Sequence, residues 1–181
     1  VVAPSWKMPE ESPGRVRVQI DPGMAFGTGT HETTRLCLRA IEQNYAPEMS
    51  FLDVGTGTGI LAMAAAKLNR QDSKVKIAAC DTDEDSVAIA RENAKANDVA
   101  GIRFGVGTIS EDTPRFDFVC ANLTVDVIIP ILDRLLEKSK QWLVLSGILA
   151  EQEGMIVDAL KTQQIDNFTI EKKGEWIAVT V

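Results

Sequence analysis

The stretch that most constrains the fold is Phe51–Gly59, an apolar run that ends in an acid and then places glycine at every second position. A strongly helix-forming segment, residues 60–68, follows directly. This order predicts a strand, a tight turn and a helix. Gly55, Gly57 and Gly59 remove Cβ atoms where a backbone passes close to a ligand, and the helix directs N–H groups and partial positive charge at the turn. The stretch therefore predicts a nucleotide-type site at the carboxyl end of a strand in an open α/β sheet.

The spacing of these glycines separates two classes of nucleotide site. The dinucleotide fingerprint G-x-G-x-x-G would need glycine at position 60, which is Ile60 in this chain. The observed G-x-G-x-G, preceded by Asp53, resembles the first motif of the class I methyltransferases, which use S-adenosylmethionine. A glycine-rich turn without a ligand is the alternative, and three alternate glycines after a strand that ends in an acid argue against it.

Composition limits the classes of function. The 181 residues suffice for one α/β domain with a sizeable core, and the net charge of −7 argues against a general nucleic-acid footprint. Cys37, Cys80 and Cys120 lie far apart in apolar segments, which predicts buried thiols in a reducing compartment rather than disulfides or a metal site. No stretch has the length and apolarity of a membrane span, and no signal peptide opens the chain. A cytoplasmic protein is expected.

The first part of the chain holds two segments that are not predicted to be core elements. Residues 1–15 contain three prolines and a glycine, which predicts an extended lead-in or linker rather than a helix. Residues 16–20 alternate apolar and polar side chains and predict a short strand. Residues 21–34 contain three glycines and four threonines and predict a loop, with a helix start near Thr30. The threonines either cap that helix or form a lid over a ligand site, and both interpretations stay open.

The same threonine-glycine segment identifies a family. Its pattern Asp-Pro-Gly-x-Ala-Phe-Gly-Thr-Gly-Thr-His-x-Thr-Thr, together with the glycine motif, resembles the methyltransferases of ribosomal large-subunit protein eleven and their close relatives. The resemblance extends from about Pro4 to Val181. Further matching segments are 81–83, 120–123, 145–149 and 174–178.

The resemblance implies the fold, a doubly wound α/β domain of Rossmann-like class I methyltransferase type. Its seven-stranded, mostly parallel sheet has the order 3-2-1-4-5-7-6 and ends in a C-terminal antiparallel hairpin. Residues 16–181 then form one S-adenosylmethionine-dependent methyltransferase domain. Pro130 is expected near the first turn of its helix, where proline is tolerated. Beyond the strand that starts at Phe51, the patterns predict helices at 33–44, 60–68, 84–97, 127–138 and 150–162, and strands at 74–80, 102–106, 116–121, 141–145, 167–172 and 175–181.

The resemblance and the glycine motif together name the residues expected to contact S-adenosylmethionine. Phe26 is expected to pack over the cofactor from the loop, with simple core packing as the alternative. No metal ligand is expected. The cofactor-contacting set is Thr34, Gly55, Gly57, Gly59, Asp81, Asn122 and Phe26.

Two of these residues have roles that follow from their chemistry. Asp81 ends the second predicted strand, 26 residues after Gly55, where an acid is placed to accept both ribose hydroxyls of a nucleoside. The alternative role is a cap for the helix that starts at Glu84, although Asp83 could supply that cap instead. Asn122 follows the fourth predicted strand and is a candidate for orienting an amine by accepting its hydrogen bond.

His31 is the only histidine and is therefore a candidate general base. A polar residue at a loop-to-helix junction is the favoured interpretation, because no carboxylate partner can be placed beside it from the sequence. We do not predict it to be catalytic.

The prediction for function is an S-adenosylmethionine-dependent N-methyltransferase acting on protein amino groups, either lysine side chains or an N-terminal amine. A ribosomal protein is the expected partner, as the resemblance implies. Direct nucleic-acid binding is not expected. Leu123, Thr124 and Val125 stand where adenine and amide methyltransferases often carry a Pro-Pro-aromatic stacking platform, which argues against a nucleobase target. Membrane binding is not expected either.

Several alternatives to this function stay open. They are methylation of a small molecule or of another protein, a domain that binds the cofactor without turnover, and a nicotinamide-dependent oxidoreductase, against which Ile60 argues. Full-length members of the family carry a separate N-terminal recognition domain ahead of the part that this chain resembles. A removed domain and a stand-alone relative are therefore both open.

Overall fold

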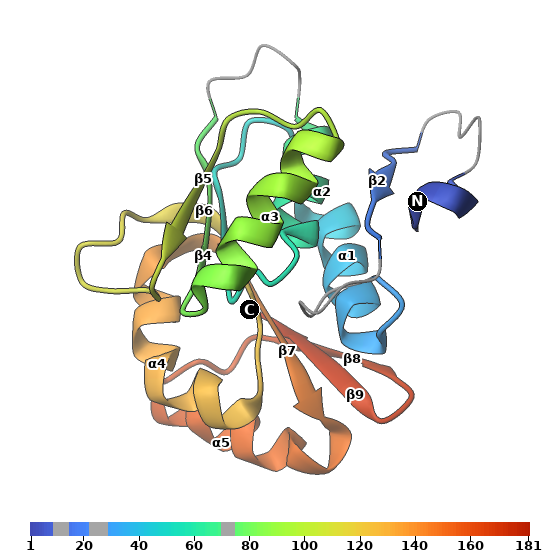
Figure 1. The fold of residues 1–181 in the computed structure, drawn as a ribbon. Coiled ribbons are helices and arrows are strands. Elements are labelled where there is room, and N and C mark those ends of the chain that lie inside the picture. Colours follow the sequence, from blue (N-terminus) through green and yellow to red (C-terminus); the bar gives the residue numbers. More distant parts are fainter. Residues whose placement is uncertain (9–14, 22–28, 70–74) are drawn as a thin grey trace.

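The structure is a computed structural model that describes residues 1–8, 15–21, 29–69 and 75–181. Its main element is a seven-stranded sheet in the order β5-β4-β3-β6-β7-β9-β8 (Figure 1). Strands β3 to β7 run parallel, whereas β9 is antiparallel to β7 and β8 is antiparallel to β9. The predicted α/β class, strand order and C-terminal hairpin are confirmed. The strands are β3 (Phe51–Val54), β4 (Ile77–Asp81), β5 (Ile102–Val106), β6 (Phe116–Asn122), β7 (Ser139–Leu149), β8 (Thr169–Lys173) and β9 (Trp176–Thr180).

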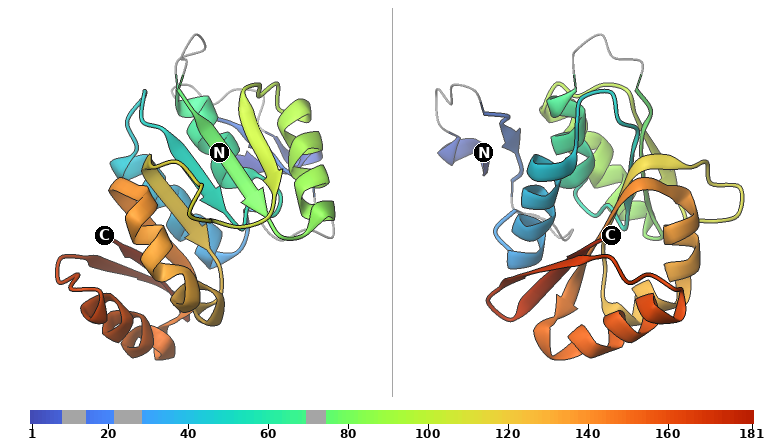
Figure 2. Two further views of the ribbon diagram at one scale, coloured as in Figure 1. Left: turned by 90° about the vertical axis from the view of Figure 1, so that its left-hand side faces the viewer. Right: turned by 180° about the vertical axis from the view of Figure 1, so that it is seen from behind.

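Helices cover both faces of this sheet (Figure 2). Helices α1, α2 and α3 pack on one face and α4 and α5 on the other, each side with its own apolar core. Helix α2 is almost entirely buried, because it lies between the sheet, α1 and the N-terminal strands, and this explains why its sequence is apolar on every side. The helices are α1 (Glu32–Asn44), α2 (Ile60–Leu68), α3 (Glu84–Ala96), α4 (Val125–Lys138) and α5 (Glu153–Thr162).

The central strand β3 is buried on both faces, and all four of its residues are buried. Phe51 belongs to the core under α1 and α2, whereas Leu52 and Val54 belong to the core under α4 and α5. Side chains alternate along a strand, so Asp53 lies on the same face as Phe51. A carboxylate is therefore placed inside the apolar layer beneath α1 and α2.

The N-terminal segment forms a separate two-stranded parallel sheet of β1 (Val2–Ala3) and β2 (Val18–Gln19). The strand predicted at 16–20 is thus confirmed in a shorter form. In the described part of the segment 1–15, which was predicted to be extended, residues Ser5–Lys7 form a 3-10 turn. Asn97, which follows α3, holds β2 in place. Its Nδ2 donates to the Gln19 carbonyl at 2.7 Å, and its Oδ1 accepts from the Gln19 N–H at 2.7 Å.

Strand β7 is longer than the predicted 141–145 because it has partners on both sides. It pairs with β6 along its first part and with β9 along its second part. The register with β9 shifts between Ser146 and Ile148, and Gly147 at the shift has a φ of +85°. This bulge bends the end of the strand.

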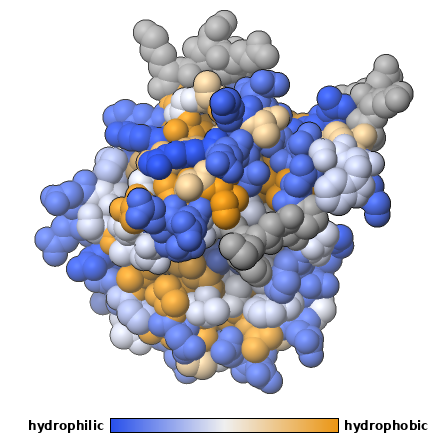
Figure 3. All heavy atoms as spheres, viewed as in Figure 1, coloured by the Kyte–Doolittle hydropathy of each residue, from blue (hydrophilic) through white to orange (hydrophobic). Residues whose placement is uncertain are grey.

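Hydrophilic side chains are spread over the face shown in Figure 3, with smaller apolar areas between them. Within the described ranges, no helix combines the length and the apolar character that crossing a membrane requires.

Pro130 is not in the first turn of its helix, so that expectation was wrong. Helix α4 begins at Val125, two residues earlier than predicted, with Thr124 as its N-cap residue. Pro130 is therefore the sixth residue of the helix. It lacks the N–H that would bond to the carbonyl of Asp126, and its ring crowds that carbonyl.

We expect Pro130→Ala to stabilise the protein, because the substitution restores one helical hydrogen bond at an exposed position. The free energy of unfolding should rise by about 1–2 kcal/mol. The gain from the restored hydrogen bond and the relieved crowding exceeds the loss from the greater conformational entropy of the unfolded chain. Urea unfolding followed by circular dichroism measures this change. An unchanged or lowered midpoint would show that the proline ring contributes packing that alanine cannot replace.

Candidate functional site

The carboxyl ends of the central strands surround a cavity of about 440 Å³. It lies between the neighbouring strands β3 and β6, where the strand order reverses. From β3 the chain continues to β4 and β5 on one side, and with β6 it begins the other half of the sheet. Ligands of open α/β sheets bind at this place. The lining residues are His31, Thr33, Gly55, Gly57, Asp81, Ser86, Asn122, Leu123, Thr124, Val127, Gly147 and Trp176.

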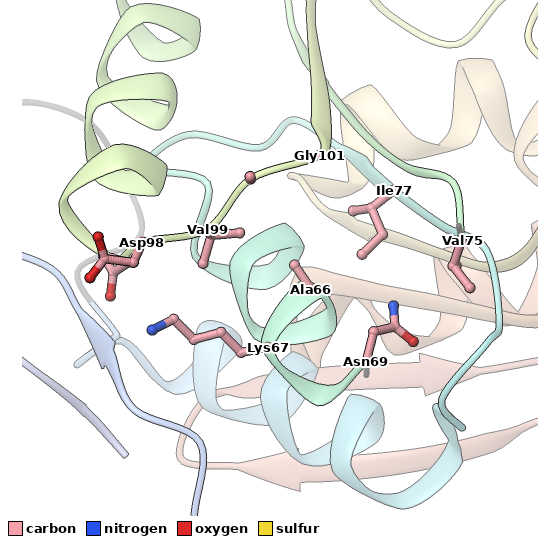
Figure 4. Close-up of a pocket in the computed structure, with 10 residues that line it drawn as sticks. Ala66, Lys67, Asn69, Val75, Ile77, Asp98, Val99 and Gly101 are labelled. Atoms are coloured by element: carbon pink, nitrogen blue, oxygen red, sulfur yellow. The ribbon is translucent and has the colours of Figure 1, made fainter. Parts of the chain in front are cut away.

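A second cavity, of about 510 Å³, lies at the amino ends of β4 and β5 (Figure 4). Its amide side chains already have protein partners. Asn69 donates to the Tyr45 hydroxyl and accepts from the Glu48 N–H, and Asn97 is bonded to β2 as described above. This cavity lies at the amino ends of the parallel strands, whereas the glycine loop lies at their carboxyl ends. We therefore assign the ligand site to the cavity at the carboxyl ends.

The glycine loop lies on one wall of the cavity at the carboxyl ends. Gly55 and Gly57 line it, with φ angles of +74° and +53° that favour glycine. A Cβ on Gly55 would collide with the side chain of Leu123. Gly59 does not line the cavity. It caps α2 with a φ of +81°, and a Cβ there would come within 3.1 Å of the Ala90 Cβ in α3. The structure thus places two of the three glycines at the cavity and the third at a helix contact.

Asp53 fixes the shape of this loop from below. Its Oδ2 accepts hydrogen bonds from the Thr56 hydroxyl at 2.7 Å and from the Ala62 N–H in the first turn of α2 at 3.2 Å. Burial raises the pKa of Asp53 to about 6, against the lowering effect of those two bonds and with a further rise from Asp81. Sequence reasoning treated Asp53 only as part of a motif and did not place it at the site.

Asp81 reaches the same loop from β4. Its Oδ2 accepts from the Gly57 N–H at 2.9 Å, and its Oδ1 accepts from the Asp83 N–H at 3.1 Å. The N-cap of α3 is Asp83, which accepts from the N–H groups of Asp85 and Ser86. Asp81 is therefore not the cap of α3. It is partly buried and lines the cavity.

Asn122 lines the same cavity from the end of β6, the strand that pairs with β3. Its Oδ1 is buried and has no hydrogen-bond partner among the described residues. A buried carbonyl oxygen without a donor is costly, and a ligand that donates a hydrogen bond would satisfy it. The next residue, Leu123, donates its N–H to the Ser146 carbonyl at 2.9 Å, which holds the turn after β6 against β7.

The threonines at the start of α1 divide between two environments. Both side chains are fully buried, but only Thr33 lines the cavity. The Oγ1 of Thr34 also has no hydrogen-bond partner in the described part of the chain. Phe26, the other residue expected from this region, lies outside the described residues.

His31 is the N-cap of α1, as expected for a polar residue at a loop-to-helix junction. Its Nδ1 accepts from the Thr33 N–H at 3.4 Å and lies 2.8 Å from the Thr33 hydroxyl. Its ring also meets Trp176 edge-on, with the ring centroids 4.9 Å apart. Both rings line the cavity. His31 therefore lies at the candidate site, although the sequence did not predict a functional role for it.

Other lining residues were missed because long-range packing brings them to the cavity. Trp176 and Gly147 belong to segments that match the family pattern, but their position depends on how β9 pairs with β7. Ser86 comes from the first turn of α3, and Val127 from that of α4. Among the described residues, no group of three or more histidine, cysteine or acidic side chains is placed to hold a metal ion.

We expect Gly147→Ala to lower the free energy of unfolding by about 2–4 kcal/mol. An added Cβ would lie 2.7 Å from the carbonyl carbon of Leu123, in a backbone conformation with positive φ that disfavours side chains. Chemical denaturation measures the change. The control is Gly154→Ala, which meets nothing within 4 Å and lies inside α5. It should be neutral or stabilise by up to about 1 kcal/mol. Equal effects of the two substitutions would contradict this account of Gly147.

Comparison with known proteins adds to this geometry. The chain is 41% identical over 187 residues to a ribosomal protein L11 methyltransferase from Desulforapulum autotrophicum, which covers 99% of this chain and 59% of that protein. Its fold matches a crystal structure of ribosomal protein L11 methylase from Lactobacillus delbrueckii subsp. bulgaricus. The TM-score is 0.83 at 30% identity, over 98% of this chain and 91% of that one.

A more distant likeness shows the fold alone. It is a Thermus thermophilus 16S rRNA N2 G1207 methyltransferase in complex with AdoMet and guanosine, with a TM-score of 0.68 at 16% identity, over 87% of this chain and 44% of that one. The chain spans about three fifths of the length of the curated relatives that it matches. The family model described as ribosomal protein L11 methyltransferase (PrmA) matches residues 1–181, and the chain therefore belongs to the ribosomal protein L11 methyltransferase family.

Proposed function

We propose that this chain transfers methyl groups from S-adenosylmethionine to amino groups of a protein, with ribosomal protein L11 as the substrate. The observation that carries the proposal is the convergence of Gly55, Gly57, Asp81 and Asn122 on one cavity, in a chain that matches the family along its whole length. Residues 16–181 would form the catalytic domain, with residues 1–15 as its lead-in. We place the protein in the cytoplasm, where ribosomal proteins are made.

The residues around the cavity fit a nucleoside with an amino-acid tail. Asp81 would accept hydrogen bonds from the ribose hydroxyls, and the backbone at Gly55 and Gly57 would lie against the ligand without Cβ atoms in the way. The unsatisfied oxygens of Asn122 and Thr34 are further candidates for polar contacts. Phe26 is proposed to pack over the cofactor, and Gly59 to support the loop from behind.

S-adenosylmethionine supplies a methyl group that is already activated on a sulfonium, so the protein mainly has to align the target amine. Such alignment contributes on the order of 7–11 kcal/mol at best. A target lysine must lose its proton first, and with an ordinary pKa of about 10.4 only about one in a thousand is neutral near pH 7.4. The apolar side chains of Leu123, Val127 and Trp176 on the cavity wall would disfavour the charged ammonium. Asn122 would orient the neutral amine by accepting one of its N–H groups.

Transfer of labelled methyl from S-adenosylmethionine to purified, unmethylated L11 tests this function, with products resolved by mass. We expect label on lysine or N-terminal amino groups of L11. A parallel extract with dissociated ribosomes searches for other substrates. Label only on another protein or on a small molecule would replace the proposed target. Cofactor binding with no transfer to any acceptor would favour a binding-only domain.

We expect Asp81→Ala to weaken S-adenosylmethionine binding by about 1–3 kcal/mol, the scale of a lost hydrogen bond to a charged group. Titration calorimetry measures the affinity. Asp83→Ala is the matched control, because it removes the same charge two residues away and costs only the cap of α3. Equal affinities of the Asp81 variant and the unmodified protein would remove Asp81 from the ribose site.

A further inference from the structure

Asp53 is a buried carboxylate whose charge has no counterpart in the site described above. Its side chain is fully shielded from solvent, and its Oδ1 has no hydrogen-bond partner among the described residues. The ion pairs found in the described ranges involve other residues. Burying a carboxylate without a cation is costly, so its presence at a ligand site points to a ligand that carries positive charge.

The Asp53 carboxyl group lies directly behind the wall of the cavity. Asp53 precedes Gly55 by two residues, and its Oδ2 is bonded to the hydroxyl of Thr56. The loop between Gly55 and Gly57 is therefore the layer that separates this charge from the ligand. Charges interact strongly across such a layer, because little water is present to screen them.

Among the described residues, the other titratable groups near Asp53 do not neutralise its charge. Burial raises the pKa of Cys80 in β4 to about 11, and a hydrogen bond with Cys37, together with burial, raises the pKa of Cys120 in β6. These thiols therefore stay uncharged near neutral pH. Asp81 carries a like charge and contributes to the raised pKa of Asp53. From α1, Cys37 lies beside Cys120, and His31 lines the cavity. The described residues of α2 nearest to Asp53 are apolar.

We propose that Asp53 is the counter-charge that makes this site bind a sulfonium cofactor more tightly than the neutral thioether left after transfer. The proposal rests on the proposed function and adds a specificity-determining residue to it. Asp53 would thereby favour exchange of spent product for fresh cofactor.

The charge balance of the reaction explains this selectivity. In the transfer, the carbon–sulfur bond breaks with its electron pair staying on sulfur, and a carbon–nitrogen bond forms from the lone pair of the amine. The positive charge moves from sulfur to nitrogen, and the methylated amine then releases a proton to solvent. Asp53 therefore faces a cation before transfer and an uncharged sulfur after it. The carboxylate attracts the cofactor but not the product at this position.

The expected pH dependence follows from the protonation of Asp53. Its pKa of about 6 means that the carboxylate is mostly charged at pH 7.5 and mostly protonated at pH 5.5. A bound cation stabilises the charged form and lowers that pKa, so the affinity for the sulfonium rises with pH through this range relative to the thioether. If the cation lowers the pKa by one unit, the preference should fall about threefold between pH 7.5 and pH 5.5.

The test is calorimetry with S-adenosylmethionine and S-adenosylhomocysteine at pH 5.5, 6.5 and 7.5. In the unmodified protein, we expect the affinity ratio of sulfonium to thioether to fall about threefold on acidification. In Asp53→Asn, which keeps the shape of the side chain and removes the charge, the ratio should be about tenfold lower at pH 7.5 and independent of pH. Circular dichroism checks that the variant is folded. If it is not, the pH series of the unmodified protein still decides.

His31→Gln is the necessary control, because a histidine on the cavity wall would also repel a cation when protonated. We expect this variant to keep the pH-dependent ratio. A ratio that becomes flat in His31→Gln would assign the selectivity to the histidine and overturn the proposal.

Two further outcomes would also overturn the proposal, and they separate it from the proposed function. Equal loss of affinity for both ligands in Asp53→Asn would mean that the carboxylate faces the amino-acid end that both share, not the sulfur. In that case the cofactor assignment survives and only this inference fails. If the unmodified protein binds neither ligand, the proposed function fails and this inference fails with it.

Discussion

The cavity depends on a loop that two carboxylates hold from different strands. Asp53 in β3 bonds to the Thr56 hydroxyl and to the first turn of α2, and Asp81 at the end of β4 bonds to the Gly57 N–H. The glycines allow the loop its positive φ angles, but they do not select one conformation, because glycine is permissive. The acids supply the missing restraint, so the backbone is shaped before any ligand arrives.

Placing two acids beside one loop has an electrostatic cost. The two acids share one loop, and burial already disfavours charge on Asp53. Asp81 offsets part of the cost with two backbone N–H donors and partial exposure, whereas Asp53 has one oxygen without any donor among the described residues. The unequal environments fit the two proposed roles, in which Asp81 would contact the ligand and Asp53 would act through its charge.

Local signals in the sequence were enough to predict the glycine loop and the acids in β3 and at the end of β4, and the resemblance to a family supplied the strand order. Each of these depends on residues that are neighbours in the chain or on a motif with fixed spacing. The position of Trp176 beside His31 could not be predicted, because it depends on the register between β9 and β7 and on the bulge at Gly147. Pro130 was misplaced because the helix begins at the buried Val125 and not at Val127, where the prediction began it.

Two glycines, Gly55 and Gly147, lie against Leu123 in the turn after β6, and different parts of that leucine face them. At Gly55 the space is filled by the side chain of Leu123, whereas at Gly147 it is filled by the Leu123 backbone. A smaller residue at position 123 would make room beside Gly55, but no change of side chain can move the peptide group that faces Gly147. The two positions therefore differ in what blocks an added Cβ. Both have a positive φ that strains any side chain, but the clash at Gly55 can be removed by changing Leu123, and the clash at Gly147 only by changing the path of the main chain.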